Sequence, residues 1–184
     1  MISIGRDIAE KKSAISAKHC NSAIGLFEAN PKLVVDLEEE GFYRKGSQYS
    51  DLAITRKHFP KFHDFMINQI QNTLDEYTKL LGLNERLGSG IEKISIMKFY
   101  QAKGNFQHHF DSQGTYFDRR LAMIWYLNDV HEGGELTFPT SSTPITISPE
   151  EGKVVVTPCD WTHSHFVTAP ITNERYSIIS FITQ

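Results

Sequence analysis

Residues 122–139 read AMIWYLNDVHEGGELTFP. Two short apolar runs lie here on either side of a polar turn that contains Gly133 and Gly134. Such runs predict β-strands, and the paired glycines predict the turn between them. The same pattern continues through the second half of the chain, with strands expected at residues 94–100, 122–127, 135–138, 145–148, 153–157, 165–168 and 176–183. Short strands at this spacing predict an antiparallel sandwich or jelly roll.

The first 90 residues have a different pattern, typical of helices and loops. One apolar stripe at helical spacing consists of Cys20, Ala23, Ile24 and Phe27. A second stripe covers residues 62–81 and ends at Gly82, where a helix C-cap glycine is expected. Residues 41–52 (GFYRKGSQYSDL) are polar and predict a long loop. The predicted class is therefore α+β with a mainly β core and N-terminal helices packed on one sheet.

Length and composition favour one globular domain over residues 1–184. The chain has 40% hydrophobic and 22% charged residues, near the averages of globular proteins. We expect residues 1–90 to supply helical support and a long loop, and residues 91–184 to form the jelly-roll core. At 184 residues a single core is large enough to fold without disulfides or metal.

Charge and hydropathy exclude several classes of partner. A net charge of -3 argues against binding to nucleic acid, which requires clustered positive charge. No run approaches 18 consecutive apolar residues, so no membrane span is expected. The N-terminus shows no apolar signal segment, and Cys20 and Cys159 imply no disulfide framework. These features predict a cytoplasmic protein, and they leave its oligomeric state open.

The segment His109-Phe110-Asp111 is the first candidate for a metal site. On a strand, residues i and i+2 face the same side, so His109 and Asp111 can reach one ion together. A distant third ligand would complete a face of two histidines and one carboxylate, which suits Fe(II) and oxygen chemistry. His108 would point to the opposite side. Taken alone, His-x-Asp is a weak signal.

Four further elements follow in order. They are Tyr126-Leu127-Asn128, then GGELTFP at residues 133–139, then PEEG at residues 149–152, and finally His165 ten residues before Arg175. Together with His-x-Asp, they resemble the prolyl 4-hydroxylase group of Fe(II)/2-oxoglutarate-dependent dioxygenases, over roughly residues 92–183. The resemblance implies a double-stranded β-helix (jelly-roll) core. One departure is Pro170, which lies five residues after His165 where the family usually has four.

The resemblance also implies roles for individual residues. His109, Asp111 and His165 match the iron ligands, which are the catalytic residues of the family. The positions that match 2-oxoglutarate-binding residues are Arg175, Tyr126, Tyr100 and Ser177. His163 remains a rival to His165, because both would lie on one strand face; the spacing to Arg175 favours His165.

The activity implied is hydroxylation of a substrate, most plainly prolyl residues of a peptide or protein, with release of succinate and CO2. Fe(II), 2-oxoglutarate and O2 would be required, and ascorbate is an accessory reductant compatible with this chemistry. A small-molecule substrate is also compatible with the family. The substrate-facing candidates are Arg119, Arg120, Trp161 and, in the expected loop, Tyr43, Arg44 and Tyr49. The alternatives are a cupin-like metal-binding jelly roll and a non-catalytic binding module.

Overall fold

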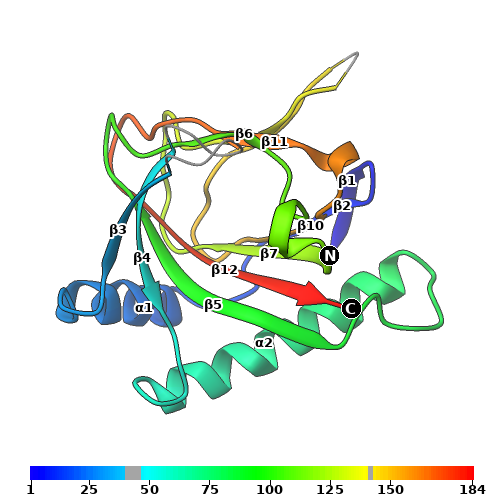
Figure 1. The fold of residues 1–184 in the computed structure, drawn as a ribbon, viewed down its shortest axis with the longest axis horizontal. Coiled ribbons are helices and arrows are strands. Elements are labelled where there is room, and N and C mark those ends of the chain that lie inside the picture. The colour runs from blue at the N-terminus through cyan, green and yellow to red at the C-terminus, as the bar shows by residue number, and fades with distance from the viewer. Residues whose placement is uncertain (40–46, 141–142) are drawn as a thin grey trace.

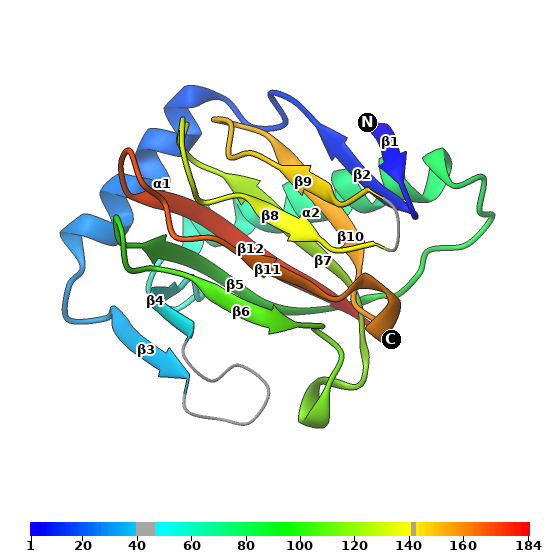
Figure 2. The same cartoon turned by 90° about the horizontal axis from the view of Figure 1, so that it is seen from above.

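The structure is a computed structural model that describes residues 1–39, 47–140 and 143–184. Two antiparallel sheets face each other. The larger sheet consists, in spatial order, of β1 (Ile2–Gly5), β2 (Ile8–Lys11), β10 (Val154–Pro158), β7 (Arg119–Tyr126), β12 (Arg175–Thr183), β5 (Gly90–Phe99), β4 (Ser47–Ala53) and β3 (Val35–Glu39). The smaller sheet consists of β6 (Phe106–His109), β11 (His165–Val167), β8 (Leu136–Phe138) and β9 (Ile145–Ile147). Figure 2 shows the smaller sheet lying over the centre of the larger one. This is the jelly roll expected from the sequence.

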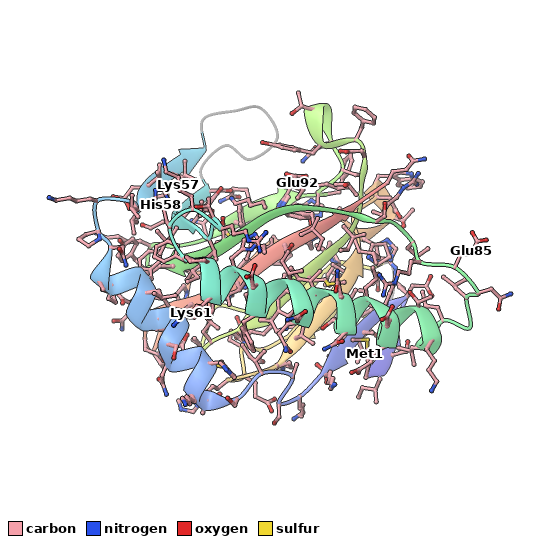
Figure 3. All side chains as sticks on the ribbon, turned by 90° about the horizontal axis from the view of Figure 1, so that it is seen from below. Met1, Lys57, His58, Lys61, Glu85 and Glu92 are labelled. Atoms are coloured by element: carbon pink, nitrogen blue, oxygen red, sulfur yellow. The ribbon has the colours of Figure 1, made fainter. Side chains whose placement is uncertain are left out.

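Two helices cover the outer face of the larger sheet, as Figures 1 and 3 show. They are α1 (Ala17–Ala29) and α2 (Pro60–Leu80). Helix α2 begins at Pro60, because proline fits the first helical turn, and ends before Gly82, whose φ is +67°. Its predicted stripe is buried against the sheet through Met66, Ile70, Leu74 and Tyr77. The prediction that the helices pack on one sheet is confirmed. Among the described residues, no helix is both long and apolar enough to cross a membrane.

The first 90 residues also contain strands, and there the expectation of helices and loops alone was wrong. Strands β1 and β2 form a hairpin, and β3 and β4 extend the other edge of the large sheet. Residues 47–52 of the expected loop belong to β4, whereas residues 41–46 lie outside the described part. Strand β4 escaped notice because its buried positions include Ser47 and Ser50, so it lacks an apolar alternation.

Successive side chains of β12 point alternately into the space between the two sheets and into the core beneath the helices. Arg175, Ser177, Ile179 and Phe181 face the space between the two sheets, while Tyr176, Ile178 and Ile182 pack toward the helices. Successive residues of a strand point to opposite faces. The helix-side face is therefore a closed apolar core, and the inter-sheet face is free to carry polar chemistry.

Candidate active site

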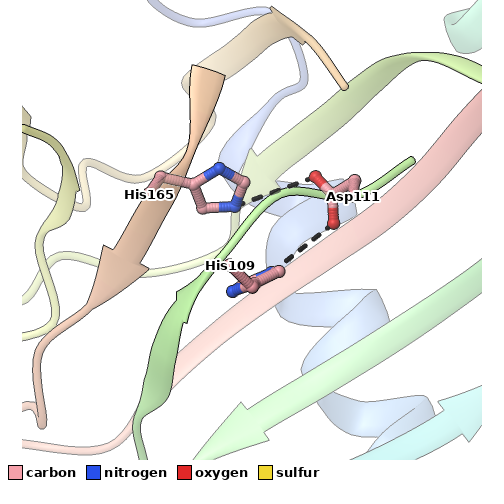
Figure 4. A group of neighbouring side chains, drawn as sticks. All are labelled: His109, Asp111 and His165. Atoms are coloured by element: carbon pink, nitrogen blue, oxygen red, sulfur yellow. Dashed lines mark ion pairs between the residues drawn. The ribbon is translucent and has the colours of Figure 1, made fainter. Parts of the chain in front are cut away.

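Three side chains that could hold a metal ion meet at one end of the smaller sheet. Strand β6 ends at His109, two residues before Asp111, and β11 begins at His165, which pairs directly with His109 in the sheet. One potential ligand atom from each lies within 4.8 Å of the other two. Asp111 Oδ1 is 3.5 Å from His109 Nε2, and its Oδ2 is 3.7 Å from His165 Nε2 (Figure 4). All three residues are buried.

Backbone carbonyls orient both imidazole rings. His109 Nδ1 lies 2.6 Å from the carbonyl oxygen of Gln107, and His165 Nδ1 lies 2.9 Å from that of His163. A carbonyl can only accept, so each Nδ1 carries the proton and each Nε2 presents a lone pair to the centre. Metal-binding histidines are commonly fixed in this way. Two neutral imidazoles and one carboxylate on a single face suit Fe(II) with coordination positions left open.

A second polar group lies deeper between the sheets. Arg175 is 2% exposed, and its guanidinium carbon is 4.6 Å from the ring centre of Phe99 and 5.1 Å from that of Tyr126. Ser177 lies next to it on the same face of β12 and pairs with Tyr126 of β7. Among the described residues, the Arg175 Nε and Nη1 atoms and the Tyr126 hydroxyl are buried without a hydrogen-bond partner.

The charges around Arg175 favour the binding of an anion. Burial lowers the pKa of Arg175 and raises the pKa of Tyr126 from their ordinary values. The acidic neighbour is Glu135; burial alone would raise the pKa of its carboxyl, but hydrogen bonds from Thr168 and Gly133 lower it. Glu135 therefore stays ionised, but it does not accept a hydrogen bond from Arg175 Nε or Nη1. Buried donors without acceptors are costly, and a bidentate carboxylate would satisfy them.

One cavity joins the metal-binding cluster and Arg175. Its volume is about 290 Å³, and its walls are largely apolar, with Met97, Phe99, Ile124 and Leu136 among them. Ser177 and Arg175 lie at one end, and Glu92 and Arg119 lie beside Phe181 at the other. The cavity can therefore hold a small anion next to the three ligand side chains and still leave room at the end lined by Glu92 and Arg119. We call this end the mouth, because the Glu92 side chain is 31% exposed there.

Residues 95–183, which contain His109, Asp111, His165 and Arg175, match the model of the 2OG-Fe(II) oxygenase superfamily. This part of the chain is similar to that superfamily. That superfamily implies Fe(II), 2-oxoglutarate and O2, and the donor set of this chain fits them. The His109, Asp111 and His165 ligand atoms suit the metal, and the unsatisfied donors of Arg175 and Tyr126 suit a carboxylate.

Several known proteins similar to this chain are named as prolyl hydroxylases. "Probable prolyl 4-hydroxylase 11" of Arabidopsis thaliana is 24% identical over 144 residues, which cover 76% of this chain and 48% of the relative. The chain thus spans about half the length of this curated relative. Solved structures show the same fold at 16% identity. A Trichoplax adhaerens prolyl hydroxylase, in complex with a hypoxia inducible factor peptide fragment, has a TM-score of 0.74 over 96% of this chain and 83% of its own. The viral collagen prolyl hydroxylase of Paramecium Bursaria Chlorella virus-1, in its 2OG complex, has a TM-score of 0.70 over 97% of this chain and 96% of its own.

The structure distinguishes the two candidate distal histidines, His163 and His165. His163 ends the 3₁₀ turn η2 (Trp161–His163), and its Nε2 donates to the carbonyl oxygen of Arg6 at 2.7 Å. It therefore points away from Asp111, and His165 is the histidine that joins the cluster. His108 is exposed and contacts the ring of Phe166.

Tyr100 does not line the cavity, contrary to the expectation from the sequence. It is 39% exposed, and its hydroxyl accepts a hydrogen bond from Ser50 at 3.0 Å. Phe99 faces the cavity instead, because neighbouring strand residues point to opposite sides. Tyr49 of β4 packs on Phe99 with ring centres 5.8 Å apart and also lines the cavity. Sequence reasoning had assigned Tyr49 to a substrate loop.

Of the other substrate-facing candidates, some line the cavity and some do not. Arg119 lines the cavity, whereas Arg120 hydrogen-bonds Gln184 outside it and Trp161 is exposed on η2. Tyr43 and Arg44 lie outside the described residues.

Proposed function

We propose that this chain is an Fe(II)- and 2-oxoglutarate-dependent dioxygenase that hydroxylates prolyl residues of a peptide or protein, with release of succinate and CO2. The observation that supports this most is the single cavity that holds His109, Asp111 and His165 together with the buried, unsatisfied Arg175. Residues 1–184 would act as one unit, with residues 1–90 supporting the core formed by residues 91–184.

In this proposal His109, Asp111 and His165 hold the metal. Bound Fe(II), with 2-oxoglutarate, supplies the activation of O2 and the oxidation of the substrate. The two imidazoles act as neutral ligands because Gln107 and His163 carbonyls hold their Nδ1 protons. Asp111 contributes the negative charge that a divalent cation requires, and all three side chains are buried.

Arg175 holds the far carboxylate of 2-oxoglutarate. Two N–H groups of its guanidinium can meet both carboxylate oxygens, and the rings of Phe99 and Tyr126 keep it in place. The Tyr126 and Ser177 hydroxyls, which are opposite each other in the sheet, can donate to the same carboxylate. The cosubstrate is then oriented with its other end toward the metal.

A prolyl substrate is supported by the relatives. The Arabidopsis relative and the Trichoplax and Chlorella-virus neighbours are named as prolyl hydroxylases, and the Trichoplax protein was solved with a peptide fragment. The cavity end away from Arg175 is lined by Glu92 and Lys93, whose side chains are 31% and 33% exposed. A side chain of an extended peptide could reach the metal from there.

The test is mass spectrometry of proline-containing peptides incubated with enzyme, Fe(II) and 2-oxoglutarate, with succinate measured in parallel. The expected result is a gain of one oxygen atom on a prolyl residue, dependent on both added components. Hydroxylation of a small molecule but of no peptide would contradict the substrate. Metal binding without any 2-oxoglutarate turnover would favour a cupin-like or non-catalytic jelly roll.

A further inference from the structure

Strand β5 contains one extra residue where it pairs with β12. Ser180 pairs with Ile94 and Phe181 with Glu92, so Lys93 has no counterpart on β12. The φ of Lys93 is +52°, a left-handed conformation that is uncommon for any residue other than glycine. An unpaired extra residue in one strand of an antiparallel pair is a β-bulge, and bulges often redirect side chains next to active sites.

The bulge brings two consecutive side chains to one cavity. In an unbroken register, Glu92 would lie opposite Ile182, whose side chain belongs to the helix-side core. With the bulge, Glu92 lies opposite Phe181, and both Glu92 and Lys93 line the cavity at its mouth. A regular strand cannot turn neighbouring residues to the same side.

Four charges at this mouth form two ion pairs. Lys93 Nζ lies 2.6 Å from Asp51 Oδ2, and Arg119 Nε donates to Glu92 Oε2 at 2.8 Å. The inner member of each pair is buried, since the side chains of Asp51 and Arg119 are 10% and 4% exposed. The outer members, Lys93 and Glu92, are 33% and 31% exposed. The mouth therefore presents an ammonium group at a place where the four charges sum to zero.

We propose that Lys93 is a specificity-determining residue whose ammonium donates a hydrogen bond to a main-chain carbonyl oxygen of the substrate, beside the residue that is hydroxylated. This inference rests on the proposed function and deepens it. An ammonium has three donors, and Asp51 engages one of them. A carboxylate on the substrate would compete with Asp51 for the Lys93 ammonium, and a cationic group on the substrate would be repelled by Lys93. A neutral acceptor avoids both penalties, and a peptide supplies one at every residue.

The test separates substrate contact from support of the fold. Lys93→Met alone leaves Asp51 buried and unpaired, so it is compared with the double variant Lys93→Met/Asp51→Asn, which removes both charges. Lys93→Arg keeps the donor. Lys57→Met makes the same change of charge on the helix-covered face seen in Figure 3 and serves as control. The probe is the neutral proline-containing peptide of 15 residues that the wild type hydroxylates fastest in the screen above.

The expected result is a KM for this peptide raised about tenfold in Lys93→Met/Asp51→Asn, as for loss of one hydrogen bond to a charged group. Lys93→Arg should restore the KM, and Lys57→Met should not change it. The KM for 2-oxoglutarate and its peptide-independent turnover should stay at wild-type values. A thioamide at the bound carbonyl should weaken wild-type binding and not weaken the double variant further.

Two negative results are distinguishable. Peptide hydroxylation with a wild-type KM in the double variant would overturn the role of Lys93 but leave the proposed function in place. A wild-type enzyme that hydroxylates no peptide would overturn the proposed function and this inference with it.

Discussion

Replacement of Arg175 by methionine should separate cosubstrate binding from metal binding. Methionine fills a similar volume but cannot donate to a carboxylate. Arg175 is 2% exposed, so the carboxylate of 2-oxoglutarate would be left buried without its partner. Loss of one member of a buried charge pair costs about 3–5 kcal/mol. At 1.4 kcal/mol per factor of ten, the Kd for 2-oxoglutarate should rise between about 100-fold and about 4,000-fold.

The assay is anaerobic calorimetric titration of 2-oxoglutarate into the metal-loaded protein. Arg120→Met, which makes the same charge change at an exposed position outside the cavity, is the control and should bind normally. Without ligand, Arg175→Met should unfold at the same temperature as the wild type or higher, because two buried donors without partners are removed. A Kd within about threefold of wild type would refute the placement of the cosubstrate.

Three further changes test other parts of the molecule. His165→Ala should abolish Fe(II) binding and turnover, while His163→Ala should retain both; the reverse in a metal titration would mean that the chosen ligand is wrong. Tyr126→Phe should weaken 2-oxoglutarate binding about tenfold, as for one lost hydrogen bond to a charged group, and unchanged affinity would exclude this contact. A hydrogen bond from Tyr176 lowers the pKa of Glu28. The stabilisation that this hydrogen bond gives the folded state is therefore complete above the unfolded-state pKa of Glu28, 4.5. It disappears as the pH falls through the lowered pKa of the folded state. Glu28→Gln should thus lower the melting temperature at pH 7 more than at pH 3, and equal losses at both pH values would contradict this.

The core strands and the metal-binding cluster were accessible from the sequence because their signals are local. Proline and glycine mark the ends of β8, β9 and β10, so their approximate bounds follow directly. The same-side placement of His109 and Asp111 depends only on their spacing. Their meeting with His165 depends on strand pairing, which the sequence alone does not specify and which only the ordered family pattern suggested.

The errors arose where burial involves polar residues or irregular pairing. Strand β4 buries Ser47 and Ser50, so the rule that apolar residues mark a strand fails there. The spacing to His109 suggests Tyr100, but β5 ends at Phe99, which faces the cavity, and Tyr100 follows it with an exposed side chain. The bulge at Lys93 has no sequence signal, because lysine is not a residue that favours a positive φ.

The most direct test of the account is turnover under oxygen-18 gas, with the label followed into both products by mass spectrometry. A dioxygenase of the proposed kind places one atom of O2 in succinate and the other in the hydroxylated prolyl residue. We predict label in both products with the wild type and in neither with Asp111→Ala, whose side chain is removed from the centre shown in Figure 4. Hydroxylated peptide carrying oxygen from water, or wild-type labelling in Asp111→Ala, would contradict the central claim.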